Sequence, residues 1–259
     1  MRLEGKRAIV VGAGQTPGDT IGNGRAIATL FAREGARVLC VDRIGARAEA
    51  TAAEINAAAI EADITSTDAC AAIIAEANTR FGGVDILINN VGIGGGGDGP
   101  AHLADEAAFD RIMNVNLKGA WLTIKAATPA LRESKGAIVN ISSLASLAGA
   151  SMIAYEVSKA ALNRLTLSVA LSNAKYGLRC NAILPGLMDT PMAMAGHSAA
   201  QGIDIETLRA KRAAQVPLNA AMGDAWDTAN AALFLACDEA KFITGVLLPV
   251  DGGMSARVG

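Results

Sequence analysis

The sequence RAIVVGAGQTPGDTIGNG, from Arg7 to Gly24, joins a short apolar run to a series of glycines. Its first part, Arg7–Val11, is typical of a buried strand, and its last glycines begin a segment that is expected to be helical as far as Glu34. Glycines placed between a strand and a helix let backbone N–H groups approach a pyrophosphate, which a Cβ would obstruct. The glycines with this expected role are Gly12, Gly14, Gly22 and Gly24. A mobile surface loop is the alternative interpretation.

The next strand-like run strengthens the dinucleotide interpretation. Arg37–Val41 ends in Asp42, about twenty residues past the glycines, where a carboxylate can accept hydrogen bonds from an adenosine ribose. A weaker run at Ala58–Glu61 is followed by Asp63 and Ile64. These two could face the adenine, but an acidic residue at a helix start explains Asp63 equally well.

Strand-like runs alternate with alanine-rich segments long enough for helices along the whole chain. This order and the uninterrupted apolar runs predict a doubly wound, Rossmann-like α/β fold, with a parallel sheet covered by helices on both faces. The 259 residues, of which 51% are hydrophobic, suffice for one domain spanning residues 1–259. The further strands are expected at Val84–Asn89, Ala137–Ser142, Arg179–Leu184 and Gly245–Pro249.

Charge and composition argue against several classes of protein. A formal net charge of -2 and the absence of a basic run argue against nucleic acid or a membrane surface as partner. No apolar segment approaches the ~18 residues of a membrane span, and the N-terminus does not resemble a signal peptide, so a cytoplasmic protein is expected. The cysteines are widely spaced, which supports neither a disulfide framework nor a metal site and favours small core residues. They are Cys40, Cys70, Cys180 and Cys237.

The segment Tyr155-Glu-Val-Ser-Lys159 suggests acid–base chemistry. A helix is predicted from Ser151, a candidate N-cap, to Gly177, a candidate stop, so Tyr155 and Lys159 project from one face. An ammonium beside a phenol favours the phenolate and lowers the tyrosine pKa, which would let Tyr155 act as general acid or base near neutral pH. A solvated helix face is the alternative, because the spacing alone is common.

Polar residues follow the middle strands of the predicted sheet. Asn89-Asn90-Val91-Gly92 can support a backbone close to a cofactor, and the four glycines Gly94–Gly97 form either a lip of the site or a simple loop. Asn116 lies inside a helix expected from Asp105 to Ala127, where a buried amide should hold a water or a backbone group. Ser142 and Ser143 end the next strand, and either could donate a hydrogen bond to a substrate oxygen.

Taken together and in order, these motifs resemble the short-chain dehydrogenase/reductase family over essentially the whole chain. The set also includes Pro185-Gly186 with Thr190 and the terminal Leu248-Pro-Val-Asp-Gly-Gly253. The resemblance implies that Tyr155 transfers the proton and that Lys159 lowers its pKa and holds the nicotinamide ribose. It further implies that Asn116 keeps a relay water, that Ser143 orients the carbonyl, and that Thr190 binds the nicotinamide carboxamide. The cofactor-binding residues are then Gly12, Gly14, Gly22, Asn23, Gly24, Asp42, Asp63, Ile64, Asn90, Gly92, Tyr155, Lys159, Pro185, Gly186 and Thr190.

Three departures from the family pattern stand out. Val11 replaces a threonine, and ten positions separate Gly12 from Gly22, so about six residues are inserted and Gly14 or Gly18 could share the work of Gly22. Asn23 stands where an aliphatic residue is common, and it could reach the cofactor or cap the helix. Ser143 lies twelve residues before Tyr155, where thirteen is common, which leaves Ser142 a claim to its role.

The function expected from these residues is NAD-dependent interconversion of a neutral, lipophilic secondary alcohol and its ketone. Apolar residues after the fifth and sixth strands would line the pocket, and residues 192–217, which include His197, would form a helical lid. The alternatives are an NADPH-dependent ketone or 3-ketoacyl reductase, for which Arg43 is the nearby basic residue, and a non-catalytic dinucleotide-binding protein. A homotetramer is expected from the resemblance. The pocket candidates are Leu144, Leu147, Met152, Leu187, Met188, Met192 and Met194.

Overall fold

The computed structural model describes residues 1–149 and 151–257, apart from the side chains of residues 197 and 199–201. Seven parallel strands form one sheet in the order β3-β2-β1-β4-β5-β6-β7, which confirms the doubly wound fold. The order reverses between β1 and β4, so the crevice that binds ligands in such sheets lies at their carboxyl ends. The strands are β1 (Arg7–Val11), β2 (Arg37–Asp42), β3 (Ala58–Glu61), β4 (Ile86–Asn89), β5 (Ala137–Ile141), β6 (Arg179–Pro185) and β7 (Leu247–Val250).

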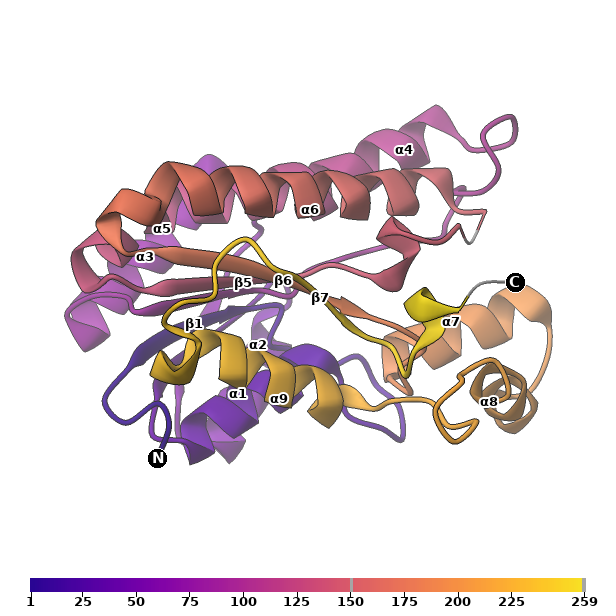
Figure 1. Cartoon of the computed structure of the whole chain (residues 1–259), viewed down its shortest axis with the longest axis horizontal. Helices are drawn as coiled ribbons and strands as arrows, with labels where there is room; N and C mark the ends of the chain where they lie inside the picture. Colours follow the sequence, from indigo (N-terminus) through magenta and orange to yellow (C-terminus); the bar gives the residue numbers. More distant parts are fainter. Residues whose placement is uncertain (150, 258–259) are drawn as a thin grey trace.

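Helices cover both faces of the sheet (Figure 1). On one face α1 (Asn23–Arg33), α2 (Gly45–Glu54) and α9 (Ala225–Ala236) bury a core that includes Phe31. On the other face lie α3 (Thr67–Phe81), α5 (Ala120–Ser134) and α6 (Ile153–Asn173). The inner strands are buried between these layers, which explains their uninterrupted apolar sequences, whereas the edge strands β3 and β7 are partly exposed. The remaining helices are α4 (Glu106–Met113), α7 (Pro191–Gln201) and α8 (Ile205–Ala213), and α7 and α8 lie together at one end of the molecule.

The start of α6 differs from the sequence prediction. The helix begins at Ile153, and Ser151 has a left-handed φ of 58°, so Ser151 is not its N-cap. Instead Asp98, far away in the sequence, accepts hydrogen bonds from Ala154 N (Oδ1, 3.0 Å) and Tyr155 N (Oδ2, 3.0 Å). A remote carboxylate therefore satisfies N–H groups of the first turn, which no local pattern indicates. The predicted stop at Gly177 is confirmed, with a φ of 76° after a short 3₁₀ turn.

A π-helical turn, Asn114–Gly119, joins α4 to α5 within the helix predicted for Asp105–Ala127. Such turns are rare and often occur at functional sites. The turn carries the fully buried Asn116, and Gly119 faces the buried Ile64, where a Cβ would come within 2.8 Å of the Ile64 side chain.

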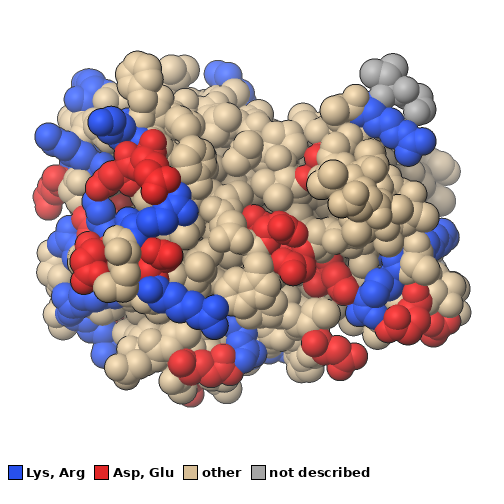
Figure 2. Space-filling view, turned by 60° about the horizontal axis from the view of Figure 1, so that its bottom comes forward, with Lys and Arg blue, Asp and Glu red and all other residues tan. Residues whose placement is uncertain are grey.

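The four cysteines are buried, as predicted, and burial raises the pKa of Cys40 to about 12 and that of Cys70 to about 11. In the described part of the chain, no helix combines the length and apolar character that crossing a membrane requires. The face of the molecule in Figure 2 carries Lys and Arg interspersed with Asp and Glu, without one continuous basic area.

Candidate active site

Tyr155 and Lys159 lie one turn apart on α6, as predicted. The Lys159 Nζ atom is 5.8 Å from the centroid of the Tyr155 ring and donates a hydrogen bond to Ile141 O (2.9 Å). The lysine is 3% exposed, whereas Tyr155 is half-buried. Gly92 makes room for the ammonium, because a Cβ there would come within 2.8 Å of Nζ. The alternative of a solvated helix face is therefore wrong for Lys159.

The pKa shifts follow from burial. Desolvation lowers the pKa of Lys159 from 10.5 to about 8, because the charged form loses water. Burial likewise raises the pKa of Tyr155, and a hydrogen bond from Ser143 lowers it in part. In this structure the pKa of Tyr155 is thus raised, although the sequence predicts that Lys159 lowers it. Desolvation of the phenolate by the surrounding protein is the dominant cause.

The structure separates the two candidate serines. The Ser142 hydroxyl is buried and donates a hydrogen bond to Lys159 O (3.1 Å), which turns it toward α6. The Ser143 side chain instead hydrogen-bonds Tyr155. Its Oγ atom also accepts a hydrogen bond from Ala145 N (3.1 Å). Of the two serines, Ser143 is therefore the one beside Tyr155, and its carbonyl-orienting role stays a prediction from the resemblance.

Asn116 uses its buried amide on the backbone, one of the two predicted uses. Its Oδ1 atom accepts a hydrogen bond from Ile93 N (2.8 Å), and Nδ2 donates to Ile93 O (2.8 Å) and to Ser158 Oγ (3.0 Å). The π-helical turn thereby fixes the segment after β4 against α6, directly beside Gly92 and Lys159. The Asn116 amide therefore has a structural role, because it fixes the backbone at Ile93 beside the site.

The glycine loop after β4 docks on the start of α6. Gly94 lies against the Tyr155 ring, where a Cβ would come within 3.3 Å of the ring, and Gly99 O accepts a hydrogen bond from Ile153 N (3.1 Å). Of the four glycines Gly94–Gly97, only Gly94 borders Tyr155, whereas Gly96 lies near Arg111 and Gly97 near Asp105. Sequence reasoning missed Asp98, because the only signal would have been an acidic residue in a glycine loop.

The glycine-rich turn packs as a dinucleotide-binding turn does. Gly12 has a φ of 79°, and its carbonyl oxygen accepts a hydrogen bond from Asn90 Nδ2 (2.9 Å). A Cβ on Gly24 would overlap that same carbonyl, so α1 can approach β1 this closely only with glycine there. The side chain of Gln15 bridges the loop of inserted residues. Its Nε2 atom donates a hydrogen bond to Thr20 O (2.8 Å), and its Oε1 atom accepts one from Gly22 N (3.0 Å).

Asp42 lies at the end of β2 beside this turn. Its Oδ2 atom accepts a hydrogen bond from Gly14 N (3.1 Å), and its Oδ1 atom accepts one from Ile44 N (3.0 Å). A Cβ on Gly14 would also come within 2.7 Å of Arg47 Cβ. Arg47 is thus a second basic residue near Asp42 besides Arg43. Sequence reasoning missed it because the fold of α2, not the spacing, brings it there.

A nicotinamide dinucleotide fits these residues. Gly22 leaves space for it, since the nearest atom to a Cβ there would be Gln15 Oε1 at 3.8 Å, and the buried Oδ1 atom of Asn23 has no hydrogen-bond partner among the described residues. An unpaired buried acceptor in such a turn calls for a donor from a ligand or a water. Asn23 does not cap α1, whose N-cap is Gly22.

Asp63 and Ile64 serve local structure in this conformation. The Oδ1 atom of Asp63 accepts hydrogen bonds from Thr65 N (2.9 Å) and Thr65 Oγ1 (2.8 Å), and these bonds lower the pKa of the carboxyl group. This geometry favours the helix-start explanation of Asp63. Ile64 is 5% exposed and packs in the core.

The segment after β6 links the site to α7 and α8. Gly186 packs against Asp251, Thr190 is buried, and Pro191 begins α7. Asp189 pairs with Arg209 of α8 (2.7 Å). The inserted loop reaches the same place, because a Cβ on Gly18 would lie 2.8 Å from Pro191 Cβ. The predicted helical segment at 192–217 is therefore present as α7 and α8.

The predicted pocket residues divide by exposure. Leu144, Met188 and Met194 are buried, whereas Leu147 and Met192 are each 58% exposed and Met152 and Leu187 are intermediate. His102 is exposed, and the side chain of His197 lies outside the described part of the structure.

A chain of buried polar side chains behind the site was not predicted. Asn89 accepts from Thr123 Oγ1 (2.7 Å) and donates to Asn140 Oδ1 (2.9 Å), and Asn140 donates to Thr166 Oγ1 (2.9 Å). It ties β4 and β5 to α5 and α6. We expect such a fully paired network to make this part of the scaffold rigid.

Comparison with known proteins identifies the family. The family model described as Enoyl-(Acyl carrier protein) reductase matches residues 19–255. The chain belongs to the short-chain dehydrogenase/reductase family. Dehydrogenases of this family use nicotinamide dinucleotide coenzymes, and the protein is an oxidoreductase.

Relatives in the short-chain dehydrogenase/reductase family match the full length. The chain is 38% identical to 2-(R)-hydroxypropyl-CoM dehydrogenase of Xanthobacter autotrophicus, over 96% of this chain and 98% of the relative. It is 37% identical to 2,5-dichloro-2,5-cyclohexadiene-1,4-diol dehydrogenase of Sphingobium indicum, over 99% of both. The solved structure of a short-chain dehydrogenase/reductase from Burkholderia xenovorans superimposes with a TM-score of 0.92 at 41% identity, covering 100% of this chain and 99% of the other.

Proposed function

We propose that this protein is an NAD-dependent oxidoreductase that interconverts a neutral, lipophilic secondary alcohol and its ketone, with Tyr155 as the general acid or base. The observation that carries the proposal is the contact set around Tyr155. Ser143 hydrogen-bonds the tyrosine side chain, and the buried Lys159 lies one turn behind it. Burying a lysine costs free energy, and a role beside a proton-transferring tyrosine would explain why the fold accepts that cost.

The residues divide the chemistry between them. The bound coenzyme supplies the hydride acceptor in alcohol oxidation and the hydride donor in ketone reduction. Tyr155 takes the hydroxyl proton in oxidation and returns it in reduction, Ser143 donates a hydrogen bond to the substrate oxygen, and Lys159 holds the nicotinamide ribose. Because its pKa is raised, Tyr155 keeps its proton at neutral pH and is ready to act as an acid toward a ketone.

Asp42 supports NAD as the coenzyme. Its carboxylate lies at the end of β2 beside Gly14, where the adenosine ribose is bound in doubly wound folds. A 2′-phosphate would bring about -1.5 to -2 charges into the same space. Two like charges roughly 4 Å apart at an effective dielectric near 20 repel by about 4 kcal/mol. The exposed Arg43 and the nearby Arg47 offset part of this repulsion and are the observation that favours an NADPH-dependent reductase as second candidate.

The coenzyme preference is testable directly. We expect kcat/KM with NAD to exceed that with NADP by at least about a hundredfold, since about 4 kcal/mol per unit charge gives about 6 to 8 kcal/mol for the phosphate, and half of that exceeds the roughly 2.7 kcal/mol of a hundredfold ratio. Asp42→Ser should narrow this ratio chiefly by improving NADP, and Arg47→Ser in the same protein should reverse part of that gain. The measurement is initial rates with a panel of secondary alcohols and both coenzymes. Equal use of NADP by the unmodified protein would contradict the role of Asp42.

The substrate class rests on the apolar residues near the site. Leu144, which follows Ser143, and Met188 and Met194, which lie on either side of Thr190 in the sequence, are buried, and thioether side chains adapt to ligands of varied shape. Arg209, a charged residue of α8, is already paired with Asp189. We propose that α7 and α8 form the lid over this pocket.

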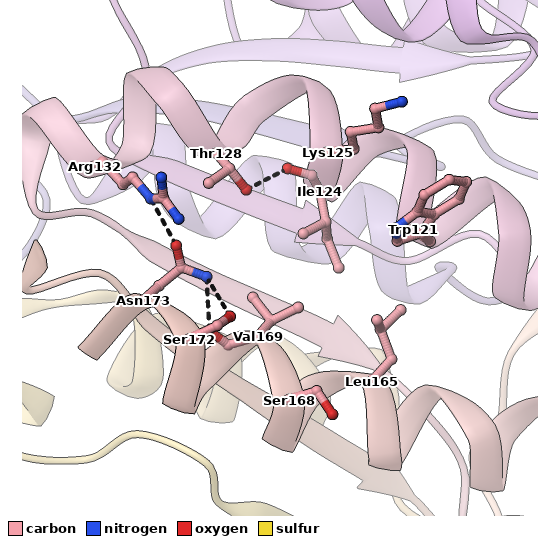
Figure 3. Close-up of a pocket in the computed structure, with 10 residues that line it drawn as sticks. All are labelled: Trp121, Ile124, Lys125, Thr128, Arg132, Leu165, Ser168, Val169, Ser172 and Asn173. Carbon is pink, nitrogen blue, oxygen red and sulfur yellow. Dashed lines mark hydrogen bonds between the residues drawn. The ribbon is translucent and has the colours of Figure 1, made fainter. Parts of the chain in front are cut away.

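A homotetramer is the proposed assembly, built on the outer face of α5 and α6. Trp121, Val157 and Leu171 are 43%, 42% and 77% exposed on these helices. A pocket of about 460 Å³ lies between the two helices. Figure 3 shows Trp121 and Leu165 on its walls, and Arg132 hydrogen-bonded to Asn173. An exposed apolar groove of this kind is typical of a surface that another chain covers, and none of the proposed catalytic residues lines it.

The assembly is checked by its mass. Light scattering at working concentration should give about four times the chain mass of 26.3 kDa. Leu171→Glu places a charge on the proposed contact and should lower the mass, whereas Leu103→Glu, in an exposed turn before α4, should not. A monomeric mass for the unmodified protein would contradict the proposal.

A further inference from the structure

Asn163 lies on α6 one turn after Lys159 and is 6% exposed. Its Nδ2 atom donates a hydrogen bond to Ser146 Oγ (2.7 Å), and Ser146 Oγ is 2.6 Å from Ser143 O. A serine hydroxyl has one proton, and here it goes to the carbonyl of Ser143. Asn163 must therefore present its NH₂ group to Ser146, which fixes the orientation of the amide.

The other end of the same amide is unused. Asn163 Oδ1 is buried and has no hydrogen-bond partner among the described residues. A buried acceptor without a partner destabilises a fold, and a leucine of similar size would fill the space without that cost. Packing alone does not explain an asparagine at this position. We therefore look to the hydrogen bond that its NH₂ group donates to Ser146.

The donor holds one side of the loop that carries Ser143. On the other side Ser142 Oγ donates to Lys159 O (3.1 Å). Two hydrogen bonds, at Lys159 and Asn163, therefore join α6 to the segment that follows β5, and they lie one helical turn apart. Ser143 lies between these points in an extended conformation (φ -165°, ψ 153°). Its Oγ atom accepts from Ala145 N, which leaves the hydroxyl proton free to face Tyr155. Releasing the Ser146 contact would let this hydroxyl move.

We infer that Asn163, acting through Ser146, is a positioning residue that holds the Ser143 hydroxyl against Tyr155 and the substrate oxygen. The inference rests on the proposed function for its kinetic consequence. The hydrogen bonds that link Asn163 through Ser146 to Ser143 do not depend on which substrate the protein uses.

The kinetic test compares two buried asparagines of α6. Asn163→Leu should lower kcat about 10- to 100-fold, because small misplacements of catalytic groups are costly, with the coenzyme Kd unchanged. Its thermal stability should be equal or higher, since the unpaired oxygen is removed. Asn173→Leu, at the far end of α6, removes a paired amide and should do the opposite, lowering stability without changing kcat. Ser146→Ala should match Asn163→Leu, and Ser146→Thr should restore activity.

A second measurement does not depend on turnover. The chain has two tyrosines, so in a Tyr176→Phe background the ultraviolet absorbance of the phenolate reports Tyr155 alone. The Ser143 hydrogen bond lowers the pKa of Tyr155, so both Ser143→Ala and Asn163→Leu should raise it. Lys159 on α6 and Asp98 at the helix start are the charged groups near Tyr155, and both are unchanged in these variants.

The outcomes separate the two proposals. Absence of turnover in the unmodified protein would overturn the proposed function, while the phenolate titration would still decide the role of Asn163. An Asn163→Leu protein with the Tyr155 titration of the parent would overturn the inference. So would loss of stability with an unchanged kcat.

Discussion

Tyr155→Phe is expected to lower kcat about 10²- to 10⁴-fold, the usual contribution of a positioned acid or base. The ring still packs against Gly94 in this variant, but the transferable proton is gone. The coenzyme Kd should stay within about twofold, because an interaction made only during proton transfer does not contribute to coenzyme binding. Fluorescence titration with coenzyme and steady-state rates measure the two quantities.

Tyr176→Phe is the matched control. Tyr176 lies in the 3₁₀ turn after α6, stacked on Arg132, and is 38% exposed. We expect wild-type kcat for this variant. Near-normal turnover in Tyr155→Phe would exclude the proposed mechanism.

The raised pKa of Tyr155 also gives the sign of the pH dependence. Alcohol oxidation needs the deprotonated phenol, so its rate should increase as the pH rises toward the raised pKa. Ketone reduction needs the protonated form and should keep its rate at neutral pH. Both profiles should flatten in Tyr155→Phe, where no phenol titrates.

Lys159→Met is expected to reduce both turnover and coenzyme affinity, since one ammonium is proposed to serve both. The methionine retains much of the apolar stem that is buried here. We expect kcat to fall about 10²-fold or more and the coenzyme Kd to rise about tenfold, in line with the loss of a charge-assisted hydrogen bond. Lys118→Met, at an exposed position of the π-helical turn, should change neither. Loss of only one of the two properties would show that the roles belong to different groups.

The pH dependence of stability tests the desolvation of Lys159 independently of activity. Because burial lowers the pKa of Lys159 from 10.5 to about 8, the charged lysine destabilises the folded state. This penalty is fully present below about pH 8 and is lost as the pH rises toward 10.5. As the pH rises through this range, the free energy of unfolding of the parent should therefore increase relative to that of Lys159→Met. The opposite trend would mean that the lysine is not desolvated.

Much of the fold was determined by the sequence alone. The apolar run Arg7–Val11 matches β1 residue for residue, because a strand buried on both faces needs an unbroken apolar sequence. The weaker run Ala58–Glu61 matches the edge strand β3, which is only partly buried. Gly177 ends the α6 segment because its left-handed conformation suits glycine. Lys159 and Tyr155 share a face because four residues make just over one helical turn. These features depend on neighbours along the chain.

Features that depend on distant segments were decided only by the tertiary structure. Asp98 satisfies the first turn of α6, and Arg47 lies near Asp42, because folding brings separate loops together. The pKa of Tyr155 is raised where the helix pattern predicts a decrease, since desolvation depends on the protein packed around the ring. Ser143 was distinguished from Ser142 by the direction of each hydroxyl, which β5 and α6 impose together.

The sequence by itself determined which groups are available and on which elements, because helix and strand periods are local. Only the packing of those elements decided what each group touches and how strongly water is excluded from it, because these are properties of residues far apart in the chain.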